Sequence, residues 1–410
     1  ALSVFWKELE TNGAPLIEPG PRGGDHVLVT FVWRADSELD NVVLVTGLED
    51  FINIGKNQLG RLGDTNLWYK TYSAHNDIRT VYRFSPNDNL VPLTEEPDMA
   101  ARIANWRRDP FNTNTFVFPA EVDGIVEKEY IRSVLELPGA PEQVYVAARD
   151  GIPKGTLNTY RFSSTVLRND RLISVYTPPG YDEKRTYPLT VFVDRYAYLS
   201  LIPTPTILDN MIKEKVIPPM VAVFVGIPTE ARTRELACYP AFGYFVANEL
   251  LDWVRQNHNV TTEPQETIIA GSSQGAVAAT YIGIRHPDVY GKVLSQSGLF
   301  WYKPNQDPEY EWLTRYIAGQ PKNETRFHVE AGLLERGAIS ADGPSILVAN
   351  RHLRTMLQAK GFTFSYEEFS GGHDYVCWRG TLSNGLKVLA GKVEDVQDLE
   401  METPWAPIPE

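Results

Sequence analysis

Residues 267–279 read Thr-Ile-Ile-Ala-Gly-Ser-Ser-Gln-Gly-Ala-Val-Ala-Ala, which predicts a short buried strand, a tight turn and a helix of small residues. The stretch contains Gly-x-Ser-x-Gly with Ser273 at its centre, a pattern typical of a serine held on a strained strand-to-helix turn. Gly271 and Gly275 suit this turn because strand and helix nearly touch there. We therefore expect Ser273 to be a nucleophile and the Gln274 amide to be an oxyanion donor at the helix N-terminus. An ordinary glycine-rich turn is the alternative.

The composition is that of a globular chain long enough for two domains. Of 410 residues, 39 are basic and 52 acidic, which gives a net charge of −13 and argues against nucleic acid or an anionic membrane as the main partner. No apolar run reaches the roughly 18 residues that would span a bilayer. Two cysteines, Cys238 and Cys377, favour reduced thiols in a cytoplasmic protein over a disulfide scaffold. Because the chain starts at Ala1, removal of a leader stays open.

Hydrophobic patterning divides the chain into two parts. Residues 1–148 are expected to form an immunoglobulin-like β-sandwich with a long loop, because short alternating strands such as Val27–Trp33 recur between turn residues. In the loop, we expect Trp106–Asn112 to pack against the second domain, with a substrate-facing role as the alternative. Residues 149–410 alternate continuous apolar strands with helices, which is typical of an α/β-hydrolase domain built on a largely parallel sheet.

The chain order of α/β-hydrolases places an acid and then a histidine after the serine. His373 is the expected base, because among the histidines it alone follows the last predicted strand in a loop, after two glycines. Glu335 is the expected acid, since it follows the preceding strand, and a carboxylate there would orient the imidazole. Asp342 and Asp374 are the alternative acids, and a serine–histidine pair without a strong acid also stays open. A surface-loop role is the alternative for the histidine.

The loop after the predicted strand Leu189–Val193 is expected to supply a second oxyanion amide, from Arg195 or Tyr196. Arginines recur in segments expected at this sheet edge, and in an acidic protein they favour an anionic substrate. Neighbouring aromatic rings would add stacking and cation–π contacts. The candidate substrate-binding residues, each with core packing or ion pairing as the alternative, are Arg195, Arg232, Arg234, Trp301, Trp378 and Arg379. In the β domain, Arg34 and Arg107 are the side chains to follow.

Several segments resemble the enterochelin esterases, hydrolases that open iron-loaded catecholate siderophores. The similarity lies in residues 271–275, in 293–301, in Glu-Ala-Gly at 330–332 and in 371–380, where Cys-Trp-Arg-Gly follows the histidine. Residues 29–34 and 234–238 are also similar, so the resemblance spans nearly the whole chain. Asp-Arg-Tyr at 194–196 departs from the Asp-Gly-Glu that is usual in the family.

The resemblance implies a cytoplasmic serine esterase that hydrolyses the trilactone of a ferric triscatecholate siderophore such as ferric enterobactin, or of a threonine-based or glucosylated relative. It implies Ser273 as nucleophile, His373 as base and Glu335 as acid, with no cofactor, because iron enters only as part of the substrate. Two alternatives stay open. One is a feruloyl or acetyl carbohydrate esterase with a β-sandwich binding module, and the other is a non-catalytic siderophore-binding protein.

Overall fold

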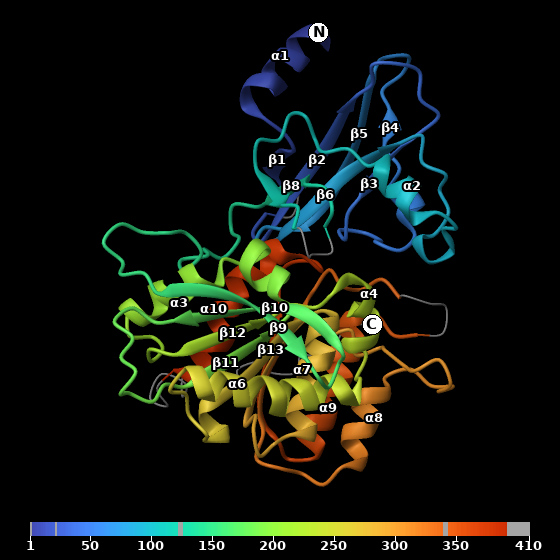
Figure 1. Cartoon of the computed structure of the whole chain (residues 1–410). Helices are drawn as coiled ribbons and strands as arrows, with labels where there is room; N and C mark the ends of the chain where they lie inside the picture. The colour runs from blue at the N-terminus through green and yellow to red at the C-terminus, as the bar shows by residue number, and fades with distance from the viewer. Residues whose placement is uncertain (1, 21–22, 122–125, 339–342, 392–410) are drawn as a thin grey trace.

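The computed structural model of the chain describes residues 2–20, 23–121, 126–338 and 343–391, which form a β domain joined to an α/β domain (Figure 1). The β domain contains two antiparallel four-stranded sheets, ordered β1-β2-β5-β4 and β3-β6-β8-β7, so the predicted sandwich is confirmed. Its strands are β1 Leu16–Pro19, β2 His26–Arg34, β3 Val42–Val45, β4 Gly60–Arg61, β5 Leu67–His75, β6 Arg79–Pro86, β7 Thr115–Phe118 and β8 Tyr130–Glu136. Its helices and 3-10 turns are α1 Leu2–Asn12, η1 Ile54–Asn57, η2 Leu93–Glu95 and α2 Met99–Ala104.

The α/β domain is built on one eight-stranded sheet ordered β16-β15-β14-β13-β11-β12-β10-β9, in which β10 runs antiparallel to its neighbours β12 and β9 and all other pairs of described strands are parallel. The strands are β9 Thr156–Ser164, β10 Asn169–Thr177, β11 Leu189–Val193, β12 Val221–Val225, β13 Thr267–Ser272, β14 Lys292–Gln296, β15 Arg326–Gly332 and β16 Thr363–Phe369. The helices are α3 Thr204–Lys213, α4 Thr229–Glu235, α5 Pro240–Tyr244, α6 Leu250–Asn257, α7 Gln274–Arg285, α8 Trp312–Gly319, α9 Ile346–Ala359 and α10 Tyr375–Ala390, with short turns η3 Ala197–Leu201, η4 Phe245–Glu249 and η5 Pro264–Glu266.

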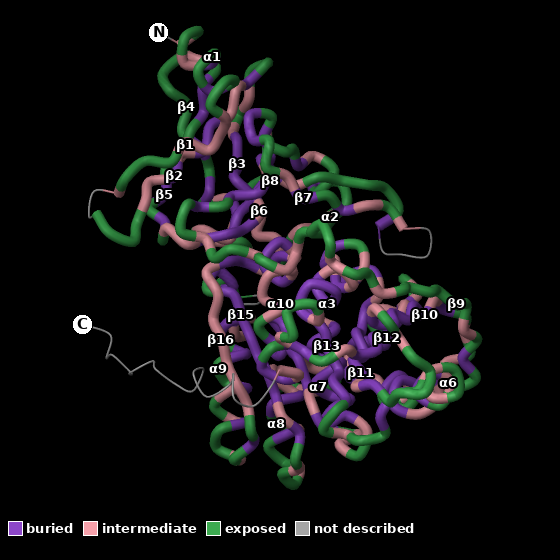
Figure 2. Tube along the Cα trace, turned by 90° about the vertical axis from the view of Figure 1, so that its left-hand side faces the viewer, coloured by how far each residue is buried: buried purple, intermediate pink, exposed green. Residues whose placement is uncertain are grey.

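Burial explains why the central strands are continuous apolar runs. Every residue of β11, β12 and β13 is buried, and Figure 2 shows these strands in purple beneath a more exposed outer layer. Helices cover both faces of a parallel sheet, so such strands have no polar face. No helix in the described part of the chain is long and apolar enough to cross a membrane.

Helix α10 begins at Tyr375, two residues after His373. Trp378, Leu382 and Leu386 recur every fourth residue and are buried against the sheet, which explains why the helix starts so early. Trp378 and Arg379 therefore lie on a helix, and Arg232 and Arg234 likewise lie on α4, which the sequence analysis missed.

The expectation that Trp106–Asn112 packs against the second domain is wrong. Trp106 is buried with Val43 and Ile54 of the β domain. Asp109 accepts a hydrogen bond from the Tyr82 hydroxyl at 2.8 Å, also within the β domain. The loop follows the sandwich because its buried polar groups find their partners there.

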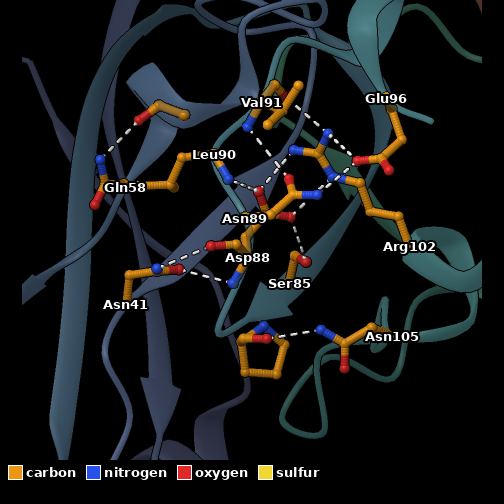
Figure 3. A network of polar contacts seen from close by, with 12 residues as sticks. Asn41, Gln58, Ser85, Asp88, Asn89, Leu90, Val91, Glu96, Arg102 and Asn105 are labelled. Atoms are coloured by element: carbon orange, nitrogen blue, oxygen red, sulfur yellow. Dashed lines mark hydrogen bonds and ion pairs between the residues drawn. The ribbon is translucent and has the colours of Figure 1, made fainter. Parts of the chain in front are cut away.

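A buried ionic cluster holds the preceding loop in place (Figure 3). Arg102 on α2 donates from Nη2 to Asp88 Oδ1 at 2.6 Å and from Nη1 to Glu96 Oε2 at 3.1 Å and to the Val91 carbonyl at 2.6 Å. Asn41 donates to the carbonyl of Asp88 at 3.0 Å. Burial alone would raise the pKa of Asp88, but hydrogen bonds from Arg102 and Ser85 lower it below its ordinary value.

The two domains meet above the start of α10 (Figure 1). The Arg79 amide donates to the Ser370 carbonyl at 3.0 Å, and Cys377 Sγ donates to the Arg79 carbonyl at 3.0 Å. One apolar cluster contains residues of both domains: Phe116, Phe118, Val126, Val134, Tyr196, Leu201, Val376 and Cys377. The β domain therefore lies directly beside the loop that carries His373.

Candidate active site

Ser273 lies at the sharp turn between β13 and α7, where the sequence placed it. Its φ of 56° and ψ of −122° are unusual for a residue with a side chain. A Cβ on Gly271 would lie 2.1 Å from the Gly275 carbonyl oxygen, so only glycine fits at that position. The Ser273 amide donates to the Gln296 carbonyl at 2.9 Å, which helps to hold the strained turn.

Three side chains form a continuous hydrogen-bonded series. His373 Nε2 lies 2.8 Å from Ser273 Oγ, and His373 Nδ1 lies 2.8 Å from Glu335 Oε1. The Glu335 side chain is fully buried, and its second oxygen accepts from the Gly332 amide at 2.9 Å. An Nδ1–H donated to the carboxylate leaves Nε2 free to accept the serine proton. The arrangement can activate a hydroxyl for attack on a carbonyl carbon.

The two alternative acids do not share this position. Asp374 points toward the β domain, where it accepts from Thr80 Oγ1 at 2.7 Å and from the Val81 amide at 3.2 Å. Burial raises the pKa of Asp374. Asp342 lies outside the described residues. Glu335 is therefore the described carboxylate that contacts His373.

Trp378 supports the histidine from behind. Its ring meets that of His373 edge to face, with centroids 4.7 Å apart and planes at 88°, and its Nε1 donates to Ser297 Oγ at 3.0 Å. Because Trp378 is 1% exposed, the expectation that it contacts substrate is wrong. The sequence analysis did not single out Ser297, although it lies in the segment 293–301 that carries the family resemblance.

A buried polar layer lies beneath this tryptophan. Gln296 donates from Nε2 to Glu330 Oε1 at 2.9 Å and to the Trp378 carbonyl at 3.1 Å, and its Oε1 accepts from the Tyr198 hydroxyl at 3.0 Å. Sequence reasoning missed these residues because a polar side chain inside an apolar strand gives no sign of its partner. They hold β14, β15 and α10 together below the serine.

The two expected oxyanion donors come from adjacent segments. Gln274 is the first residue of α7, and the loop after β11 begins with Asp194, whose φ is 88°. Strands β11 and β13 are parallel neighbours, which places this loop beside the Ser273 turn. Arg232 Nη1 lies 2.6 Å from Asp194 Oδ2 and so holds the strained residue that precedes Arg195.

The arginines predicted to bind substrate lie in different parts of the structure. Arg195 donates from Nε to Ser174 Oγ at 2.8 Å and pairs with Glu121, so its guanidinium lies toward β10 and the β domain, whereas Arg232 pairs with Asp194. Arg234 is exposed on α4, with its guanidinium 5.2 Å from the Tyr239 ring centroid. The remaining candidates, Arg379 and Trp301, lie elsewhere: Arg379 donates to Gln143 Oε1 at 2.7 Å at the domain junction, and Trp301 packs half-buried against the core.

A cavity of about 620 Å³ adjoins the loop after β11. Its lining includes Asp194, Arg195 and Tyr196 from that loop and Glu121 from the β domain. Ser273 and His373 are not among the lining residues, so the cavity is separate from the Ser273–His373–Glu335 series.

Three side chains in the described part of the chain are close enough to hold a cation. Potential ligand atoms of His328, Glu330 and Glu367 all lie within 4.8 Å of one another, but Glu330 is already hydrogen-bonded to Gln296 and Thr381. This group belongs to the polar layer beneath Trp378.

Comparisons with known proteins cover both domains. Residues 28–146 match the family model described as "Enterochelin esterase, N-terminal", and residues 164–389 match the one described as "Putative esterase". The chain is 27% identical to an iron(III) enterobactin esterase of Dickeya dadantii, over 94% of this chain and 92% of the relative, and 28% identical to that of Escherichia coli K12, over 87% and 90%. The crystal structure of a Shigella flexneri enterobactin esterase in the presence of enterobactin superposes with a TM-score of 0.71 and 26% identity, covering 92% of this chain and 95% of the other.

Proposed function

Since the chain belongs to the enterochelin esterase family, we propose that it is a serine esterase that hydrolyses the trilactone of ferric enterobactin or a close triscatecholate relative and so releases iron. The observation that carries the proposal is the series Ser273–His373–Glu335. It occurs in a chain that resembles enterobactin esterases over both domains and nearly its full length.

In the proposed acylation step, Ser273 Oγ attacks a lactone carbonyl carbon while His373 Nε2 accepts the serine proton. Buried Glu335 stabilises the imidazolium that forms. The carbonyl oxygen becomes an oxyanion, and the backbone amides of Gln274 and Arg195 are the proposed donors to it. When the intermediate collapses, the ester C–O bond breaks and His373 returns the proton to the leaving hydroxyl.

Water completes the reaction. His373 removes a proton from a water molecule, which attacks the ester carbon on Ser273 Oγ, and the returned proton frees the serine. Each cycle thus opens one ester bond and consumes one water. In this proposal no cofactor takes part, and iron arrives with the substrate.

We also propose that the reaction takes place in the cytoplasm. Cys238 and Cys377 are both buried and unpaired, and burial raises the pKa of both thiols. Buried reduced thiols suit the reducing cytoplasm, where an iron-releasing esterase would act on imported siderophore.

A chromatographic product assay tests the proposed substrate. The wild-type protein would be incubated separately with ferric enterobactin, iron-free enterobactin, a threonine-based trilactone and methyl ferulate, each with Ser273→Ala as control. We expect linear trimer, dimer or monomer from the catechol trilactones and from wild type alone. Turnover of methyl ferulate with no opening of any trilactone would overturn the proposal in favour of a feruloyl esterase. Binding of ferric enterobactin without any turnover would favour a siderophore-binding protein.

A further inference from the structure

Two arginines of the β domain lie side by side at the junction with the α/β domain. In the antiparallel pairing of β6 with β8, Tyr82 is opposite Ser133, so the next positions are Arg83 and Arg132. Like charges at opposing positions destabilise a sheet. Burial and the charge of Arg132 lower the pKa of Arg83 to about 9.

Both arginines face the α/β domain. Val81 and Val134 lie two residues from Arg83 and Arg132 on the same strands, and both contact the apolar cluster at the domain junction. Side chains two positions apart on a strand share a face. The cluster also contains Tyr196, which lies in the loop after β11 and lines the cavity there.

The negative charge near Arg83 and Arg132 is too small to balance their two positive charges. Arg132 Nη1 lies 3.9 Å from Asp374 Oδ1, and its Nε is buried with no partner among the described residues. No described carboxylate lies within ion-pair distance of Arg83. Asp374 is the residue after His373 and already accepts two hydrogen bonds from the β domain. Two guanidinium groups thus share one distant carboxylate next to the catalytic histidine.

The geometry suits an aromatic anion. The Arg83 guanidinium carbon lies 4.1 Å from the Trp106 ring centroid, and that of Arg132 lies 4.4 Å from the Phe118 centroid. Each guanidinium therefore lies over a protein ring, and both residues are half-buried. A planar guanidinium can donate two parallel hydrogen bonds to adjacent oxygens and stack on a second ring.

We infer that Arg83 and Arg132 form a subsite in which the β domain binds a catecholate of the iron-loaded substrate while Ser273 attacks its trilactone. This inference rests on the proposed function. It assigns the β domain a direct part in choosing the iron-loaded form, because ferric triscatecholate is an anion whereas the iron-free catechols are largely protonated and neutral near pH 7. The sequence pointed instead to Arg34 and Arg107. The structure pairs Arg34 with Glu10 at 2.8 Å, and Arg107 Nη1 donates to the Ala104 carbonyl at 2.7 Å.

Steady-state kinetics on two substrates tests the subsite. The variants are Arg83→Gln, Arg132→Gln and Arg83→Lys, and the control is Arg61→Gln, which removes an arginine of the same domain that pairs with the exposed Glu38. For ferric enterobactin we expect KM to rise about tenfold in each Gln variant. For iron-free enterobactin we expect KM to change by less than about twofold. The KM of Arg83→Lys for ferric enterobactin should lie between those of wild type and Arg83→Gln. Lysine keeps the positive charge but lacks the planar guanidinium that donates two parallel hydrogen bonds.

The outcomes separate the two proposals. If wild type opens the trilactones but the Gln variants match it on ferric enterobactin, or lose the ferric and iron-free substrates equally, the subsite is overturned and the esterase stands. If wild type opens neither substrate, the proposed function fails and this inference fails with it. Ferric enterobactin binding to Ser273→Ala, with and without Arg83→Gln and with thermal unfolding as a check of folding, gives a second readout. An unchanged Kd in the folded double variant would also overturn the subsite.

Discussion

Two charged clusters, one within the β domain and one at the domain junction, differ in how the charge of their arginines is balanced. Arg102 lies between Asp88 and Glu96 and also donates to a backbone carbonyl, so the loop cluster is complete within itself (Figure 3). At the domain junction, the one described carboxylate that Arg83 and Arg132 share is Asp374, whose nearest oxygen is 3.9 Å from Arg132. A complete cluster stabilises the fold, whereas the excess positive charge next to His373 is the basis of the proposed subsite for an anion.

Glu335 extends this comparison into the α/β domain. The carboxylate is fully buried, and its contact is an imidazole rather than a permanent cation. In the proposed mechanism that imidazole becomes positive only while Ser273 is attacking or the leaving group departs. The charge of Glu335 is therefore balanced during the reaction, just as the junction arginines are balanced when an anion binds.

The largest loss of stability is expected when the Arg102 cluster is disrupted. Arg102→Leu leaves the buried carboxylate of Asp88 without its cation, and breaking a buried ion pair costs about 3–5 kcal/mol in free energy of unfolding. Urea unfolding followed by tryptophan fluorescence would measure it, with Arg61→Gln as the exposed control. A loss under about 1 kcal/mol would remove the distinction between the two clusters.

The variant Glu335→Gln tests the role of the Glu335 carboxylate, whose partner His373 carries a positive charge only during the proposed reaction. We expect kcat for ferric enterobactin to fall about a hundredfold or more, because the amide stabilises the imidazolium less and does not select the same tautomer. Thermal unfolding should show a folded protein. A folded Glu335→Gln enzyme with the wild-type kcat would move the acid role to another residue, with Asp342 the first to be tested.

The pH dependence of stability should report the Arg102 cluster. The folded-state pKa of Asp88 lies below its ordinary value of 3.8, so its contribution is present above that value and is lost as pH falls through the folded pKa. Asp88→Asn should therefore be less stable than wild type at pH 6, and the difference should narrow below about pH 4. Unfolding midpoints measured from pH 6 to pH 3 would show this, and a constant difference would contradict it.

The smallest effect on stability is expected from a substitution at the domain junction. Arg83→Gln removes one of two like charges, so the free energy of unfolding should change by less than about 1 kcal/mol even though KM for ferric enterobactin rises. Added salt should raise the wild-type KM for ferric enterobactin more than that of Arg83→Gln, since screening weakens the same attraction. Destabilisation as large as that of Arg102→Leu would make Arg83 a structural residue.

Local sequence was enough to predict the serine turn and its partners. Ser273, His373 and Glu335 each follow a strand of one parallel sheet, so chain order alone places them at one edge. The junction could not be predicted in this way. Arg83 and Arg132 are 49 positions apart in the sequence, and Asp374 lies in the other domain, so their proximity depends on strand register and on how the domains pack. Trp378 was misassigned because nothing in the sequence distinguishes a tryptophan facing substrate from one buried behind a histidine.

The most direct test of the account is the rate at which Ser273→Ala converts saturating ferric enterobactin to linear trimer, set beside its Kd for the same compound. We predict that the rate falls about 10⁴-fold or more relative to wild type while Kd stays within about threefold, since the hydroxyl takes part in bond making and little in binding. A Ser273→Ala protein that opens the trilactone at the wild-type rate would contradict the serine mechanism. A folded variant that no longer binds would show that Ser273 serves the structure of the site rather than its chemistry.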